Sequence, residues 1–436
     1  MDSSFVFQEQ APWRSSSGDE EEASPRLEEF EDDESELQDT LAHQVVSGAR
    51  DAQGIPWSAT PYTRADYRQV RQSQHRTYFN REVEVATAKS RLAMEAVKVS
   101  TSNTNMFMFH RNWRRLHSTI VHFQLRNLLW CPTTTDMYAV HENRVLTYST
   151  ATRVLRTVMD IGGGIAAPGA PGIGAAQVCT LCVKHGMAAA GGFGGELVVK
   201  RLESLETFTY SKRVTDNENG ITNAIEIAPS PSGQVSVICS NNDNRVRCLD
   251  AETFQSVSTH VMPWAVNTTV AQPGGRLLCS VGDDPGALIF DPGVGPSRPA
   301  VKLADGHVDF SFAAAWHPGG NCVATGNQDC TTRVYDIRAP GKCLALLLSN
   351  VGAVRSLRFS DCGNFLAAAE PADFVTIFDV TTSYKRAQVI DLFGELAGVA
   401  FCPGSDCLNI AVADPHYSSV LQYNKMRMSY LYPLCE

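Results

Sequence analysis

The sequence predicts an all-β fold of seven repeated four-stranded units set around a ring, which is the architecture of a β-propeller. Two markers carry this prediction. Glycines that close a turn between two short strands recur at separations of 42, 45 and 43 residues: Gly233, Gly275, Gly320 and Gly363. Acids that end a strand recur at separations of 41, 45 and 43 residues: Asp250, Asp291, Asp336 and Asp379. Two markers with one period in the low forties are typical of propeller blades.

The first part of the chain differs from the rest in charge. The chain has 436 residues and a net charge of −10. Twelve acids and one base, Arg26, lie between Asp19 and Asp39, so this short region carries −11 and the remainder about +1. Its few large apolar residues cannot offset the entropy of ordering, so we predict that residues 1–60 are a disordered acidic tail. The near-neutral remainder offers no electrostatic footprint for a phosphate backbone, so nucleic acid is not an expected partner.

Residues 61–115 are predicted to be a short helical segment that precedes the propeller. The stretch from Thr63 to Val99 contains no Gly or Pro and is rich in Arg, Gln, Glu, Ala and Lys. Thr63 is a suitable N-cap, with Asp66 three residues later. We expect one or two partly exposed helices that lie on the following domain or bind a partner.

Residues 118–436 are predicted to form the propeller. Weaker copies of the repeat flank the four clear ones, at 127–149, 177–202 and 397–424, which brings the count to seven. The alternating segment "STIVHFQ", residues 118–124, precedes the first copy. We expect it to complete the last blade as its outer strand, which would remove an exposed sheet edge.

One unit resembles a known family. The segment "GHVDFSFAAAWHPGGNCVATGNQDCTTRVYDIR", residues 306–338, is similar to a WD repeat, with a Gly-His pair at its start and Tyr335-Asp336 in the Trp-Asp position. The resemblance extends over roughly 118–424 and implies a WD-repeat, transducin-like β-propeller. A narrower resemblance, which includes the acidic tail and "QGIPW" at 53–57, is to a little-characterised plant and fungal WD-repeat subfamily that brings no established activity.

The WD-repeat resemblance implies a structural hydrogen-bond network within this unit. Its members would be His307, Thr325, Asp329 and Tyr335, where Tyr335 replaces the Trp of the family. An aspartate in the turn before the third strand can accept from backbone N–H groups and from an imidazole, so that buried polar groups are satisfied. Stability must otherwise come mainly from apolar packing between blades.

The first functional hypothesis is a non-enzymatic scaffold for protein–protein interaction, because WD-repeat propellers usually hold partner proteins. The second is a substrate receptor of a cullin-type ubiquitin ligase. Tyr335-Asp336-Ile337-Arg338 resembles the aromatic–Asp–x–Arg sequence by which some WD-repeat receptors dock on the ligase adaptor, so Asp336 and Arg338 would be the docking residues. The third is an enzyme or small-molecule binder that uses the central channel.

Other sequence motifs give weaker evidence for a functional site. Cys179 and Cys182 form a CxxC, but residues three apart on a strand point to opposite faces, so we interpret them as buried thiols and not as a zinc or redox site. We find no hydrolase, zinc-protease or kinase motif, and expect no catalytic residue, metal ligand or cofactor. The thirteen cysteines are scattered and are expected to be reduced. No apolar run is long enough to span a membrane. We expect a protein of the cytoplasm that also enters the nucleus.

Overall fold

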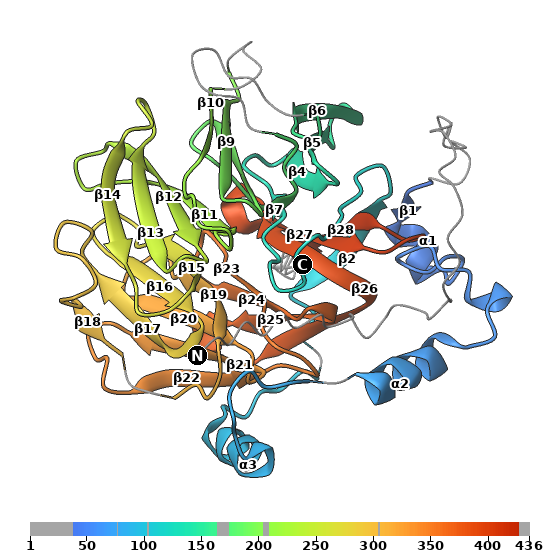
Figure 1. Cartoon of the computed structure of the whole chain (residues 1–436). Coiled ribbons are helices and arrows are strands. Elements are labelled where there is room, and N and C mark those ends of the chain that lie inside the picture. The colour runs from blue at the N-terminus through green and yellow to red at the C-terminus, as the bar shows by residue number, and fades with distance from the viewer. Residues whose placement is uncertain are drawn as a thin grey trace, which may run out of the picture.

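The computed structural model describes residues 38–75, 77–102, 104–163, 174–203, 209–303 and 306–426. Its strands form five four-stranded sheets and one eight-stranded sheet, all antiparallel and arranged around a common centre (Figure 1). The five four-stranded sheets are β3 (Leu129–Trp130), β4 (Asp136–His141), β5 (Arg144–Ser149) and β6 (Val154–Asp160); β7 (Val178–Lys184), β8 (Met187–Gly192), β9 (Glu196–Arg201) and β10 (Tyr210–Arg213); β11 (Thr222–Pro229), β12 (Val235–Asn241), β13 (Arg245–Asp250) and β14 (Ser256–Val261); β15 (Val266–Ala271), β16 (Leu278–Gly282), β17 (Asp284–Phe290) and β18 (Val301–Lys302); and β19 (Ser311–Trp316), β20 (Cys322–Asn327), β21 (Thr331–Asp336) and β22 (Cys343–Leu348).

The eight-stranded sheet joins two blades through one long strand. The first half of β26 pairs with β25 and its second half pairs with β27, so β26 is the outer strand of one blade and the inner strand of the next. The count of seven blades depends on this division and stays a prediction. In spatial order the strands are β1 (Thr40–Leu41), β2 (Phe107–Trp113), β28 (Ser419–Lys425), β27 (Cys407–Ala413), β26 (Ala387–Phe401), β25 (Ala372–Asp379), β24 (Phe365–Ala369) and β23 (Ser356–Phe359).

The innermost strands form a closed ring. Within the described residues, each of β3, β7, β11, β15, β19, β23 and β26 contacts the next, and β26 contacts β3. Buried apolar residues fill the spaces between neighbouring sheets; for example, Val323 and Tyr335 of one sheet pack in one cluster with Cys279 and Ile289 of the sheet before it. The all-β propeller prediction is therefore confirmed, and its stability comes from apolar packing between blades.

The glycines that marked the repeat are required by the turn conformation. Gly233, Gly275, Gly320 and Gly363 have φ of +87°, +70°, +72° and +73° respectively. A side chain is disfavoured in this left-handed region, so glycine is the residue that closes the turn after an inner strand at least cost. The period read from the sequence is thus the spacing of a fixed backbone geometry.

The last blade is closed by a different segment from the one predicted. Strand β2, residues Phe107–Trp113, pairs antiparallel with β28. Residues 118–124 form no strand and instead lead from the rim to β3, with the Thr119 N–H donating to the Val140 carbonyl at 3.0 Å. Residues 118–124 therefore belong to the connection between the closing strand β2 and the innermost strand β3.

The segment before β2 contains two larger helices, as expected, but it also holds more structure than predicted. Thr63 caps α2 and accepts from the Asp66 N–H. Residues 1–37 lie outside the described residues, whereas residues 38–60 are folded, which corrects the prediction of disorder for that part. They contact the propeller, for example through the hydrogen bonds of Gln53 with the Phe393 backbone. The helices are α1 (Ala42–Val46), η1 (Trp57–Ala59), α2 (Arg64–Gln74), α3 (Val85–Glu95), η2 (Val380–Thr382) and η3 (Pro403–Ser405).

Residues 51–104 form a segment that we call the N-terminal strap. The structure describes all of its residues except 76 and 103. The strap begins on the last two blades, where the side-chain amide of Gln53 exchanges two hydrogen bonds with the Phe393 backbone at 2.6 and 2.7 Å. Three arginines of α2 then reach acids of the propeller, and α3 lies beside β22. In the described ranges, no helix is both long and apolar enough to cross a membrane.

Candidate interaction surface at the channel mouth

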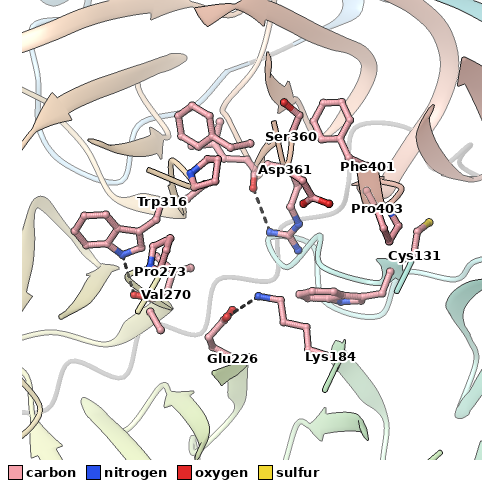
Figure 2. A pocket seen from close by; sticks show the side chains of 18 of the residues that line it. Cys131, Lys184, Glu226, Val270, Pro273, Trp316, Ser360, Asp361, Phe401 and Pro403 are labelled. Atoms are coloured by element: carbon pink, nitrogen blue, oxygen red, sulfur yellow. Dashed lines mark hydrogen bonds and ion pairs between the residues drawn. The ribbon is translucent and has the colours of Figure 1, made fainter. Parts of the chain in front are cut away.

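A cavity of about 360 Å³ lies at one mouth of the central channel (Figure 2). Every innermost strand contributes a lining residue from its carboxyl-terminal half, because the strands run in the same direction around the ring. These residues are Trp130, Lys184, Glu226, Val270, Trp316, Arg358 and Phe401. The repeat therefore brings together side chains that are one or more blades apart in sequence.

Two cations lie against the ring of Trp130. Its indole Nε1 donates to the Leu181 carbonyl at 2.5 Å, which fixes the ring plane. Lys184 Nζ is 5.4 Å and the Arg358 guanidinium carbon 4.8 Å from the ring centroid, both within cation–π range. A second indole, Trp316, donates to the Val270 carbonyl at 3.2 Å. The mouth thus combines fixed aromatic surfaces with charge.

The charges in the mouth are only partly balanced. Lys184 Nζ is 2.6 Å from Glu226 Oε1, and Figure 2 shows the two side chains pointing toward each other. Burial lowers the pKa of Lys184, but the Glu226 carboxylate outweighs this effect and raises it overall. Arg358 donates to the Leu357 carbonyl at 3.1 Å and to Asn127 Oδ1, and burial lowers its pKa. The ion pairs found among the described residues include none for Arg358, and the nearby Glu226 carboxylate opposes the effect of burial on its pKa.

The opposite mouth of the channel is covered by the N-terminal strap. Tyr78 Oη accepts from Arg355 Nη2 at 3.1 Å and from Gln124 Nε2 at 3.4 Å. Arg355 leads into β23 and Gln124 leads toward β3, and these two strands are separated in the ring by β26. The Tyr78 hydroxyl therefore links the segments that precede β23 and β3, at the end of these strands opposite the cavity. The backbone N–H of Asn80 adds a bond of 2.8 Å to Asp309 Oδ2.

The structure joins His307, Thr325 and Asp329 of the predicted network by hydrogen bonds. His307 Nδ1 lies 3.0 Å from Asp329 Oδ2, and His307 Nε2 lies 2.9 Å from Thr325 Oγ1. Asp329 also accepts from the Val308 N–H and from Thr331 Oγ1. Tyr335 lies buried on β21 in the same sheet, within an apolar cluster. The arrangement fixes the turn before β21 and contains no group that faces the channel mouth.

Burial by itself would favour the neutral form of Asp329. The charge and hydrogen bond of His307, together with the bonds from Thr331 and Val308, outweigh burial and lower the pKa of Asp329. A lowered pKa in the folded state stabilises the protein at pH values above the unfolded pKa of about 3.9, and this stabilisation is lost as the pH falls through the folded pKa.

Asp329→Ala is expected to lower the free energy of unfolding by about 1–3 kcal/mol at pH 7, because buried donors lose their acceptor. Urea denaturation followed by circular dichroism would measure it, and the difference from wild type should shrink below about pH 4. Asp284→Ala is the matched control: Asp284 stands in the corresponding position of the preceding blade, is half-buried and accepts from the Gly286 N–H. An equal decrease in the free energy of unfolding for the two variants would contradict the assignment of Asp329 to the hydrogen-bond network.

The predicted docking residues lie on the surface. Arg338 Nε and Nη2 donate to the two Asp336 oxygens at 2.9 and 2.7 Å, with 67% of the Arg338 side chain exposed. These bonds hold the pKa of Asp336 at about 2. Arg338 is therefore accessible, but its charge is already paired within the chain.

The cysteines differ from expectation at one place. Cys179 and Cys182 are buried on β7, and burial raises the pKa of Cys182 to about 12, in accord with inert thiols. Cys402 and Cys407, however, are disulfide-bonded, which corrects the expectation that all cysteines are reduced. The two residues flank the turn between β26 and β27, and strand pairing brings them together.

In the part of the chain that is described, no cluster of His, Cys, Asp and Glu is suited to a metal ion.

The residues of the channel mouth were not predicted from the sequence. Each looks ordinary in its own repeat, as one residue near the end of a short apolar strand. The available signal was positional: Lys184 and Glu226 are 42 residues apart, which is close to one repeat, so their side chains come from the innermost strands of neighbouring blades.

Comparison with known families matches one repeat directly. The family model "WD domain, G-beta repeat" matches residues 300–336. The chain is 35% identical over 106 residues to "WD repeat-containing protein 1" of Rattus norvegicus, which is 24% of this chain and 16% of the relative. It is 24% identical over 243 residues to "Pre-mRNA-processing factor 19 homolog 2" of Arabidopsis thaliana, which is 54% of this chain and 44% of the relative. The chain therefore spans less than half the length of these relatives.

A solved structure shows the same fold. A chain in "Crystal Structure of Mitotic Checkpoint Complex" superposes with a TM-score of 0.58 at 16% sequence identity, covering 76% of this chain and 98% of that chain. At this level of identity the likeness concerns the fold alone. The family-model match adds that the repeat at 300–336 is of the WD type.

Proposed function

Because the chain is a WD-repeat β-propeller protein, we propose that it is a non-enzymatic scaffold for protein–protein interaction that contacts a partner at the channel mouth lined by Trp130, Trp316 and Arg358. One observation carries the proposal: the strap covers one end of the channel, and the other end is an open, aromatic-lined depression. Tryptophan and arginine are the side chains most enriched at binding hot spots. The relatives and the solved complex support binding to other proteins.

The polar groups of the mouth favour binding over catalysis. Lys184 is paired with Glu226 and its pKa is raised, so it stays protonated and is a poor base or nucleophile at neutral pH. We assign the channel no substrate or cofactor. We place the protein in the cytoplasm, with entry to the nucleus, and expect neither nucleic acid nor a membrane as partner.

The test is affinity capture with a mouth variant and a matched control. Asp361 lies exposed at the rim of the mouth, and Glu142 lies exposed in the turn between β4 and β5, at the other end of the blades. Asp361→Lys is expected to reduce recovery of specific partners at least tenfold, whereas Glu142→Lys should leave recovery unchanged, since reversing a charge at the rim of an interface disturbs its electrostatic complementarity. Unchanged recovery with Asp361→Lys, or equal loss with both variants, would argue against the mouth.

A second candidate is the cullin-ligase receptor, which the exposure of Arg338 favours. Arg338→Ala should change the free energy of unfolding by less than about 1 kcal/mol, since exposed ion pairs contribute little. The variant therefore tests docking without disturbing the fold. Loss of co-purification with the ligase adaptor would support this function; no adaptor with the wild type, or equal recovery with the variant, would exclude it.

A further inference from the structure

Three sulfur atoms meet beside the channel mouth. Asn409 Nδ2 lies 3.3 Å from Cys131 Sγ, 3.2 Å from Cys402 Sγ and 3.7 Å from Cys407 Sγ. Cys402 and Cys407 form a disulfide, whereas Cys131 is a free thiol. Cys131 also lines the mouth, and Figure 2 shows it on the same side of the cavity as Pro403, which follows Cys402. One amide nitrogen thus contacts a thiol and both sulfurs of a disulfide.

The two sulfurs nearest this nitrogen belong to different blades. Cys131 directly follows β3, the first innermost strand, and Cys402 directly follows β26, the last. These strands contact each other where the ring closes, and the Leu128 N–H donates to the Ala397 carbonyl at 3.1 Å across the junction. A bond between Cys131 and Cys402 would therefore join the first blade to the last.

We propose that Cys131, Cys402 and Cys407 form an internal thiol–disulfide exchange site. The Cys131 thiol gives up its proton, and the thiolate attacks Cys402 Sγ. The Cys131–Cys402 bond forms as the Cys402–Cys407 bond breaks, and Cys407 leaves as a thiolate that takes up the proton. One disulfide and one thiol are present before and after the step, so the exchange needs no external oxidant or reductant.

The surroundings favour exchange within the molecule over exchange with dissolved thiols. Cys131, Cys402 and Cys407 are 7%, 3% and 5% exposed, so a solution thiol has little access to them. Burial raises the pKa of Cys131 to about 12, although the hydrogen bond from Asn409 opposes this effect. The thiolate fraction is therefore small at neutral pH, and we expect slow exchange that accelerates in mild base.

The position of the disulfide would affect the rim of the mouth. The turn that it closes contains Ser405, a non-glycine residue with φ of +64°. Ser405 Oγ accepts from the Cys362 N–H at 3.1 Å, and the Gly404 N–H donates to Asp361 Oδ2 at 3.2 Å. When the disulfide of Cys402 changes its partner from Cys407 to Cys131, it no longer closes this turn. It then links the first blade covalently to the last. This consequence for partner binding rests on the proposed function, whereas the exchange itself does not.

The experiment is peptide mapping of the full chain, purified without reductant. The protein is held at pH 8.5, the free thiols are blocked with a maleimide, and the digest is analysed by mass spectrometry without reduction. Wild type is expected to yield both Cys402–Cys407 and Cys131–Cys402 linked peptides. Cys131→Ser should yield the first link alone. Cys407→Ser, refolded from urea with oxidised glutathione as the oxidant, should yield the second link alone, and Cys362→Ser should match wild type.

The linked Cys407→Ser protein should also unfold at a higher denaturant concentration than Cys131→Ser, because its bond closes a far longer loop. Absence of the Cys131–Cys402 peptide from wild type would overturn the proposal, even if Cys407→Ser fails to fold. Full maleimide labelling of Cys131 in folded Cys407→Ser would overturn it as well. These readouts need no partner, so their failure leaves the scaffold proposal standing, and loss of that proposal leaves the exchange intact.

Discussion

Arg68→Ala is expected to lower the free energy of unfolding by about 3–5 kcal/mol, the range for removing one partner of a buried ion pair. Arg68 on α2 is 8% exposed, and its two terminal nitrogens lie 2.9 Å from Asp373 Oδ2 and 2.6 Å from Asp391 Oδ1. Its guanidinium also stacks over Phe374 and Phe393, at 4.6 and 4.2 Å from the ring centroids. The alanine variant would leave Asp373 buried with Arg71 as its remaining cation.

Urea denaturation would measure this loss, and limited proteolysis would locate it. Detachment of α2 should expose the strap to cleavage before the propeller unfolds. Arg64→Ala is the matched control on the same helix, because Arg64 also contacts Asp391 but 42% of its side chain is exposed. Its expected loss is below about 1 kcal/mol. Similar losses for the two variants would mean that the strap is held by something other than the buried pair.

Phe107→Ala is expected to lower the free energy of unfolding by about 3–5 kcal/mol, the range for deleting a fully buried phenylalanine side chain. Phe107 begins the closing strand β2 and is 1% exposed, with its ring 5.1 Å from that of Phe365 and 5.8 Å from that of Phe401. The side chain of Gln388 also bonds the backbone N–H and carbonyl of Phe107, at 2.8 and 2.7 Å. The cavity left by alanine would loosen the joint between two blades.

The control for this prediction is the next residue. Met108→Ala removes a side chain that is 50% exposed on the other face of β2, and should change stability by no more than about 0.5 kcal/mol. Thermal unfolding and urea denaturation of both variants would check the difference. A small loss for Phe107→Ala would show that β2 contributes little to ring closure.

The fold could be predicted from the sequence because a repeated geometry leaves a repeated residue. Gly233, Gly275, Gly320 and Gly363 mark the same left-handed turn, so their spacing gave the blade length directly. The closing strand could not be placed in the same way. Segment 118–124 alternates more clearly than segment 107–113, yet it is 107–113 that pairs with β28.

The strap and the channel mouth were beyond prediction for a different reason. Gln53 and Arg68 look like residues of a polar tail until the acids and carbonyls of blades more than 300 residues later are placed beside them. Pairing across such separations is invisible to local patterns. The network of His307, Thr325 and Asp329 could be predicted because all its members lie within one repeat.

The closing strand also sets the order of events during biosynthesis. Trp113 of β2 bonds Gln422 of β28, a partner 309 residues later, so β2 leaves the ribosome long before the strand with which it closes the blade. At 5–20 residues per second, β2 and the strap wait on the order of 15–60 s for their partners. During that time the arginines of α2 and the edge of β2 are available to chaperones. The ring can therefore close only after β28 has been synthesised, and we expect a ribosome stalled before β28 to carry a chain that is still open to proteases.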